Sequence, residues 1–230
     1  MLHVQQEQLV RFDSPSFYFR PQKLDPNLSV AVLEELGSSE FYLVPQTLPK
    51  FSPAFDMILR DIAKYDQSGA PIVIIFNKDK VFWKNRLHRR LTAIMGEDLI
   101  SRIIFIPSLT TNEFQAVLNA STVLLDPYPF GGGVTSLEAF LFCKPVITAP
   151  GLQTVPALTA GFYSHMGIME LIANSTVKFV ELAIKVRNDS QWRNRITQEI
   201  CEKKKVLYEN KDSVREWEGF FRRVSTSSGN

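Results

Sequence analysis

The sequence predicts an α/β fold in which a parallel sheet is covered by helices on both faces and is followed by a helical C-terminal segment. Short apolar runs alternate with amphipathic stretches over the first two thirds of the chain, which is typical of strands joined by helices. The runs are continuously apolar, as expected for parallel strands that are buried on both faces. From Val177 to Val224 the apolar spacing is helical instead.

Five apolar runs account for the predicted strands. They are FYLVP from Phe41, APIVIIFN from Ala70, RIIFIP from Arg102, TVLLDP from Thr122 and PVITAP from Pro145. The predicted helices between them are SPAFDMILRDIAKY from Ser52, the stretch from Phe82 to Met95, the stretch from Asn112 to Asn119, and TSLEAFLFC from Thr135. One helix therefore separates each pair of successive strands, as in a parallel sheet.

Composition indicates one globular domain without a nucleic-acid or membrane partner. A chain of 230 residues can bury a substantial core. Its formal net charge is only +2, and Lys and Arg are dispersed among Asp and Glu. KNRLHRRL, which begins at Lys84, has helical spacing and is interpreted as the solvated face of a helix. No run reaches the roughly 18 apolar residues of a membrane span, and the N-terminus lacks the apolar core of a signal peptide.

The two cysteines give no indication of a disulfide framework. Cys143 and Cys201 form no CxxC pair, so nothing favours an oxidising compartment, and a cytoplasmic or nuclear protein is expected. The three histidines are scattered, and no pair of carboxylates has the DxD-like spacing that holds a diphosphate through a cation. We therefore expect no metal.

The segment DPYPFGGGVTSLEAF combines several features of an anion site. Ligands of open parallel sheets bind at the carboxyl ends of the strands, and TVLLDP ends there with Asp126. Gly131 to Gly133 permit positive φ angles and close approach of the backbone, while Val134, Thr135 and Ser136 begin the next helix. Free backbone N–H groups, hydroxyls and the positive end of a helix dipole together suit a diphosphate.

Two further residues fit the same site. Glu138, in the first turn of that helix, is placed to accept hydrogen bonds from ribose hydroxyls. Lys50 precedes the helix start at Ser52, so its cation lies near the positive end of the helix dipole, which is unfavourable. An anion bound between Lys50 and the helix would remove this conflict. Each feature also has a structural explanation: a strand-to-helix turn for the glycines, a complement to the dipole for Glu138, and a solvated loop position for Lys50.

Read together, DPYPFGGGVTSLEAFLFCKPVITAPG and FYLVPQTLPKFSPAFD resemble the donor-binding half of the SPINDLY and O-linked N-acetylglucosamine transferase family. RIIFIPSLTTNEF and HMGIMELIAN follow in the matching order, so the likeness extends from about Phe41 to Ile172. The resemblance implies a B-type glycosyltransferase fold, in which two Rossmann-like halves face each other across a cleft. The C-terminal half of that fold holds the nucleotide sugar.

The resemblance also assigns roles to residues that follow the first and the third predicted strands. Lys50 corresponds to a lysine at the donor diphosphate, a catalytic role in which it stabilises charge on the departing nucleotide. Gln46 and Thr47 line the same pocket. Leu109 and Phe114 fall in the block that packs on the base. Phe114 stands where animal members carry a histidine, so stacking on the base is retained while a ring nitrogen is lost.

A second group of residues is assigned to the phosphates and the ribose. Gly132, Gly133, Val134 and Thr135 match the segment that holds the phosphates, and Glu138 matches the acidic residue at the ribose. Gly133 and Val134 replace a histidine and a threonine of the animal members, which leaves more of the binding to backbone N–H groups. The family includes sugar transfer from both uridine and guanosine diphosphates; the expected donor is a UDP-sugar, and a GDP-sugar is the alternative.

The sequence predicts three parts: a lead-in segment (1–36) of mixed character with three prolines, a Rossmann-like nucleotide-sugar-binding domain (37–175), and C-terminal helices that pack on it (176–230). The face formed by Val214, Trp217, Phe220 and Phe221 either covers the domain's own sheet or crosses to the other half. The N-terminal half of the cleft, with its acceptor contacts, does not fit before Phe41. We therefore expect weak activity from this chain unless that half is supplied in trans.

The expected reaction is transfer of N-acetylglucosamine from a nucleoside diphosphate to a Ser or Thr hydroxyl of a protein. One alternative is a non-catalytic nucleotide-binding remnant or module of the same fold. Another is a nucleotide-sugar epimerase of the same architecture, which requires acid and base residues that the sequence does not indicate.

Overall fold

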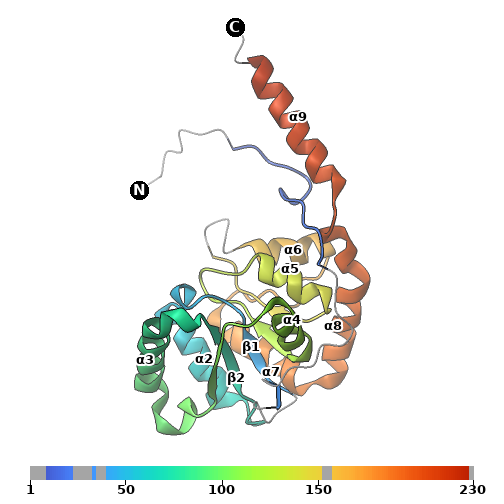
Figure 1. The fold of residues 1–230 in the computed structure, drawn as a ribbon. Coiled ribbons are helices and arrows are strands. Elements are labelled where there is room, and N and C mark those ends of the chain that lie inside the picture. Colours follow the sequence, from blue (N-terminus) through green and yellow to red (C-terminus); the bar gives the residue numbers. More distant parts are fainter. Residues whose placement is uncertain (1–8, 23–32, 35–39, 152–156, 228–230) are drawn as a thin grey trace.

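The computed structural model describes residues 9–22, 33–34, 40–151 and 157–227, and its centre is a five-stranded parallel sheet (Figure 1). The strands are β1 (Tyr42–Val44), β2 (Ile72–Phe76), β3 (Ile103–Pro107), β4 (Val123–Leu125) and β5 (Val146–Ile147). Their order across the sheet is β3-β2-β1-β4-β5. All five predicted strands and their parallel pairing are confirmed.

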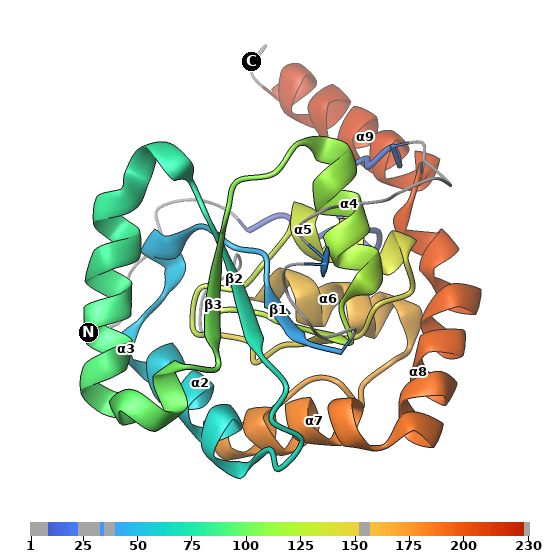
Figure 2. The same ribbon diagram turned by 60° about the horizontal axis from the view of Figure 1, so that its bottom comes forward.

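Helices cover both faces of the sheet, as predicted (Figure 2). They are α2 (Pro53–Tyr65), α3 (Val81–Ile100), α4 (Thr111–Ala120), α5 (Val134–Leu141), α6 (Leu158–Met166), α7 (Thr176–Asn188), α8 (Ser190–Lys203) and α9 (Lys211–Ser227). The short 3-10 turns are η1 (Leu48–Lys50), η2 (Lys78–Lys80) and η4 (Lys204–Leu207). Helices α2 and α3 lie on one face and α4 and α5 on the other, while α7 packs against α2.

Local signals explain where the helices on either side of the sheet begin. Ser52 caps α2, since its Oγ accepts a hydrogen bond from the backbone N–H of Phe55 at 3.1 Å, and Pro53 occupies the first helical position. At α4, Thr110 and Glu113 form a reciprocal capping box.

Within the part of the chain that the structure describes, no helix is long and apolar enough to cross a membrane.

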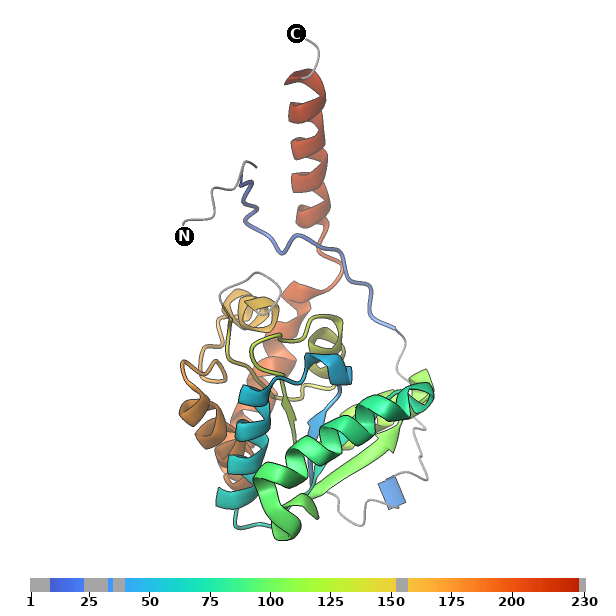
Figure 3. The same ribbon diagram turned by 90° about the vertical axis from the view of Figure 1, so that its left-hand side faces the viewer.

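The C-terminal helices divide into two groups. Helices α7 and α8 pack on the domain as predicted, whereas α9 projects away from it (Figure 3). The N-terminal segment runs along the base of α9: the ring centroids of Phe12 and Trp217 are 4.8 Å apart, and Trp217 Nε1 donates to the Ser16 carbonyl at 3.0 Å. The aromatic face of α9 therefore does not cover the sheet. The proposed boundaries at 36 and 175 stay predictions.

The expectation that the cysteines are unpaired is wrong. Cys143 and Cys201 form a disulfide that joins the residue just beyond α5 to α8, with their Cα atoms 5.0 Å apart. The pairing depends on the packing of α8 beside α5, which a separation of 58 residues in the sequence does not reveal. The cysteines consequently give no support to a reducing compartment, and the cytoplasmic or nuclear location stays a prediction.

Reduction of this disulfide should lower the stability of the domain. Closing a 58-residue loop restricts the unfolded chain, which corresponds to at most about 4 kcal/mol. Chemical denaturation with and without a phosphine reductant measures the difference. A Cys143→Ala, Cys201→Ala double variant should have the stability of the reduced protein, and the reductant should not change its stability. Two thiols that react freely in the oxidised protein would contradict the pairing.

Candidate functional site

The candidate site lies at the carboxyl ends of two neighbouring strands, whose following helices lie on opposite faces of the sheet. β1 leads through η1 into α2 on one face, and β4 leads through the glycine turn into α5 on the other. β1 and β4 are paired in parallel, so their carboxyl ends lie side by side. Such a switch point leaves a crevice at the carboxyl edge, which is where open α/β sheets bind ligands.

Lys50, at the end of η1, reaches across this crevice. Its Nζ donates to Gln46 Oε1 at 2.7 Å and to the Gly131 carbonyl at 3.3 Å, and lies 4.8 Å from the centre of the Phe130 ring. Burial lowers the pKa of Lys50, and the nearby carboxylate of Asp126 opposes that shift. The side chain is thus held at the glycine turn, so a freely solvated loop position does not describe it.

Gln46 and Thr135 close the crevice from its two sides. The Gln46 amide nitrogen donates to the Thr135 hydroxyl in α5, and the same side chain accepts from Lys50 through its Oε1. Ser52 Oγ adds a third link, a 2.6 Å hydrogen bond to the Tyr128 carbonyl. The predicted residues Gln46, Lys50 and Thr135 therefore meet in one network.

Asp126 lies beneath this network and is only 4% exposed. Its Oδ2 accepts a hydrogen bond from the Thr148 hydroxyl at 2.9 Å. Burial raises the pKa of Asp126 to about 6, while hydrogen bonds from the hydroxyls of Thr148 and Thr159, the charge of Lys50 and the Gly132 N–H act in the opposite direction. The carboxyl group thus ties the end of β4 to β5, α6 and the glycine turn.

The predicted close approach of backbone at the glycines is found at Gly132. A Cβ atom there would lie 2.7 Å from Ser136 Oγ, 2.8 Å from Asp126 Oδ1 and 3.0 Å from Gln46 Nε2. Gly133, which precedes the first residue of α5, has more space, because a Cβ atom would lie 3.4 Å from Leu158 Cδ1.

The remaining predicted residues occupy different parts of the edge. Val134 and Thr47 are exposed, and Glu138 is half-buried, which raises the pKa of its carboxyl. Glu138 is not in the first turn of α5, as the sequence analysis had it, but one position beyond. The dipole of α5 therefore gives little reason for a carboxylate at this position.

Leu109 and Phe114 follow β3 and are partly buried against the core. They stay predicted base contacts.

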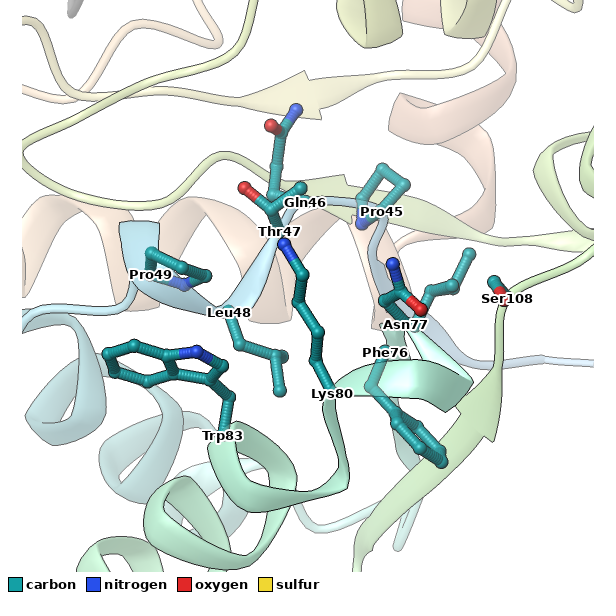
Figure 4. A pocket seen from close by; sticks show the side chains of 11 residues that line it. Pro45, Gln46, Thr47, Leu48, Pro49, Phe76, Asn77, Lys80, Trp83 and Ser108 are labelled. Carbon is teal, nitrogen blue, oxygen red and sulfur yellow. The ribbon is translucent and has the colours of Figure 1, made fainter.

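A cavity of about 350 Å³ opens beside the network (Figure 4). Its lining comes from the ends of β1, β2 and β3, from η1 and from the start of α3, and consists of Pro45, Gln46, Thr47, Leu48, Pro49, Ile75, Phe76, Asn77, Lys80, Trp83 and Ser108. Gln46 and Thr47 were predicted pocket residues, whereas Leu109 and Phe114 are not part of this lining. The sequence analysis did not single out Trp83 or Asn77, although Asn77 ends a predicted strand and Trp83 lies at the start of a predicted helix.

Among the described residues, no group of three or more His, Cys, Asp or Glu side chains is placed to hold a metal ion. The cations at this edge that the structure describes in the network and the cavity are Lys50 and Lys80. Charge on a bound anion would be met there by ammonium groups, by hydroxyls and by the N–H groups at the start of α5.

Known structures share this architecture. A lysine-to-methionine mutant of the Thermobaculum terrenum O-GlcNAc transferase matches with a TM-score of 0.72 and 21% identity, over 94% of this chain and 41% of that one. The chain shares the fold of that transferase. The trehalose-6-phosphate synthase of Burkholderia multivorans matches with a TM-score of 0.60 and 11% identity, over 86% of this chain and 46% of that one.

A third structure of this fold contains a nucleotide sugar. It is an E. coli trehalose-6-phosphate protein bound with UDP-2-fluoro glucose, which matches with a TM-score of 0.55 and 15% identity, over 88% of this chain and 47% of that one. This chain therefore spans less than half the length of each of the three structures. No family model matches the sequence. The predicted likeness to an O-GlcNAc transferase is confirmed at the level of the glycosyltransferase fold.

Gly132→Ala should destabilise the protein, because the added methyl group meets Ser136, Asp126 and Gln46 at 3.0 Å or less. We expect a loss of about 1–3 kcal/mol in the free energy of unfolding, as for other overpacked sites. Urea denaturation measures it. Gly133→Ala is the matched control and should cost less, since its nearest neighbour is a flexible side chain. Equal losses for both variants would contradict the packing at Gly132.

Asp126→Asn should change how stability depends on pH. The pKa of Asp126 is about 6 in the folded protein against about 3.9 in an unfolded chain, so the folded state binds the proton more tightly. Stability is then greatest below the unfolded pKa and falls as pH rises through about 6. Relative to the variant, the wild-type protein should lose up to about 3 kcal/mol between about pH 4 and about pH 7.

Denaturation at a series of pH values measures this difference. The same substitution at the exposed Asp98 is the control and should leave the pH profile unchanged. A constant difference between wild type and Asp126→Asn across the pH range would contradict the raised pKa.

Proposed function

We propose that the chain is the donor-binding half of an enzyme that transfers N-acetylglucosamine from UDP to a Ser or Thr hydroxyl of a protein. The observation that carries the proposal is the convergence of Lys50, Gln46 and Thr135 at the start of α5, at the switch point of a glycosyltransferase fold. A lysine, a hydroxyl and the N-terminus of a helix at one point form a binding site for a diphosphate. The E. coli structure of the same fold, with its UDP-sugar, supports a nucleotide-sugar ligand.

In the proposed reaction the bond between the anomeric carbon of the sugar and the β-phosphate oxygen breaks, and a bond to the acceptor oxygen forms. Negative charge develops on the departing UDP. Lys50 stabilises that charge, and it is already positioned by Gln46 and Gly131, so little reorganisation accompanies the reaction. Thr135 and the N–H groups of α5 hold the phosphates, and Glu138 accepts from the ribose. Leu109 and Phe114 pack on the base.

The acceptor side of the reaction belongs to a second half of the cleft. The three compared structures are more than twice as long as the matched portion, which supports a partner domain for this one. That domain, in cis or supplied in trans, contributes the acceptor contacts and the base that takes the proton of the hydroxyl. We therefore propose that the present chain binds the donor and turns it over slowly alone.

Calorimetric titration with UDP and with GDP, in a chelator, tests the donor site. We expect UDP to bind and a Lys50→Ala, Glu138→Ala double variant to lose at least about tenfold in affinity, because charge-assisted contacts to phosphate and ribose are removed. A Lys178→Ala, Glu181→Ala variant is the matched control, since it removes the same two charges from an exposed ion pair on α7.

Tighter binding of GDP than of UDP would overturn the choice of donor. Binding of neither nucleotide, or equal binding by the two double variants, would overturn the proposed site and favour a remnant of the fold without the donor pocket.

A further inference from the structure

We propose that the disulfide between Cys143 and Cys201 is exchangeable and that Cys201 is its site of modification by low-molecular-weight thiols. A thiolate of the glutathione type attacks Cys201 Sγ, and Cys143 Sγ leaves as a thiolate beside the Lys204 ammonium group. The modified residue lies on α8, and the leaving sulfur lies just beyond α5, the helix that begins at the candidate site.

The two cysteines differ in their access to solvent. Cys143 is 6% exposed and belongs to the hydrophobic core, whereas Cys201 is an exposed residue of α8. The rate of thiol–disulfide exchange depends on which sulfur an incoming thiolate can reach. Attack therefore falls on Cys201, and Cys143 becomes the leaving group.

Lys204 is placed to stabilise the leaving thiolate. Its Nζ lies 3.2 Å from Cys143 Sγ and donates to the Leu141 carbonyl at 2.6 Å. The carbonyl groups at the end of α5 disfavour a negative charge beside them, and a cation at this position opposes that effect. A nearby lysine also lowers the pKa of a thiol, and a thiol of lower pKa is the better leaving group. The charge distribution thus favours the same direction of exchange as the exposure.

Among the residues that the structure describes, no carboxylate forms an ion pair with Lys204. Both of its contacts there are to neutral acceptors, and partial burial lowers the pKa of its ammonium group. Its neighbour Lys203, by contrast, is paired with Glu199. A thiolate at Cys143 supplies the missing negative charge in a partly buried place, where opposite charges attract more strongly than in water.

The backbone at Cys143 has a conformation that is usually occupied by glycine. Its φ is 57°, its N–H donates to the Phe140 carbonyl at 2.9 Å, and the Lys144 N–H donates to the Ala139 carbonyl at 3.1 Å. This is the Schellman arrangement of a helix end, in which glycine is common at the left-handed position. Cys143→Gly therefore suits the end of α5 and removes the sulfur, so it provides a folded variant in which Cys201 is a free thiol.

The exchange balances without an oxidant. The incoming thiolate forms a bond to Cys201 Sγ as the bond between the two cysteines breaks, and the electron pair of that bond stays on Cys143 Sγ. The products are a mixed disulfide at Cys201 and a thiolate at Cys143 paired with Lys204. Attack of a second thiolate on the outer sulfur of the mixed disulfide releases Cys201 and a disulfide of the small thiol.

Peptide mapping tests the site of modification. The oxidised protein is incubated with reduced glutathione, and free thiols are trapped at early times with N-ethylmaleimide. We expect glutathione on Cys201 and maleimide on Cys143, because only Cys201 is exposed. Cys143→Gly, treated with oxidised glutathione, should carry a stable adduct on Cys201.

Three results would overturn the assignment of Cys201. They are glutathione on Cys143 with maleimide on Cys201, a native disulfide that does not exchange while a denatured sample does, and absence of an adduct in Cys143→Gly.

The rate of exchange tests the role of Lys204. Lys204→Met should slow it about three- to tenfold, because the leaving thiolate loses its neighbouring charge, and Lys204→Arg should recover most of the rate. Lys205→Met is the matched control and should stay within about twofold of wild type. It removes the same charge from the next residue, which is exposed, and so controls for attraction of the negatively charged glutathione.

A second measurement separates charge from packing. In a Cys201→Ser background, the pKa of the Cys143 thiol, followed by the ultraviolet absorbance of the thiolate, should rise when Lys204→Met is added. An unchanged thiol pKa, or equal slowing of exchange by Lys204→Met and Lys205→Met, would overturn the role of Lys204.

Discussion

The parallel pairing of β1 with β2 on one side and with β4 on the other is the constraint on which the rest of the molecule depends. Residues 42–44 of β1 are fully buried, so this strand has no freedom to change register without exposing apolar surface. Because crossover connections between parallel strands are right-handed, the chain that leaves β1 and the chain that leaves β4 must diverge to opposite faces. The crevice between them is therefore a consequence of the topology, and the loops only decide which side chains enter it.

The side chains of the crevice place a lysine at the glycine turn and a buried carboxyl group beneath it. Lys50 is held by neutral oxygens of Gln46 and Gly131, while the carboxyl group of Asp126 is buried below them in surroundings that oppose its ionisation. Hydroxyls and the start of α5 add partial positive charge on the solvent side. The crevice thus presents a positive charge outward, and at Gly132 it leaves no room for a side chain, because a Cβ atom would meet Ser136, Asp126 and Gln46.

Local patterns in the sequence were sufficient for the strands and for two of the loops at the candidate site. Continuous apolar runs predicted the parallel sheet, and the short motifs around Lys50 and Thr135 predicted two loops that do meet in space. The bond between Cys143 and Cys201 was missed because it depends on how α8 packs beside α5. Trp83 was likewise hidden, since its place beside η1 follows from the crossing of α3 over the sheet rather than from helical spacing.

The contact between the N-terminal segment and α9 has a practical consequence for dissecting the molecule. Glu216 accepts hydrogen bonds from the backbone of Asp13 and Ser14, and Ser213 donates to the Phe17 carbonyl, so the two segments are joined by polar as well as aromatic contacts. Phe17 in turn packs on Phe162 of α6. Deleting either segment would strip the other of its covering surface, and shortened versions for crystallisation or fusion should keep both or remove both.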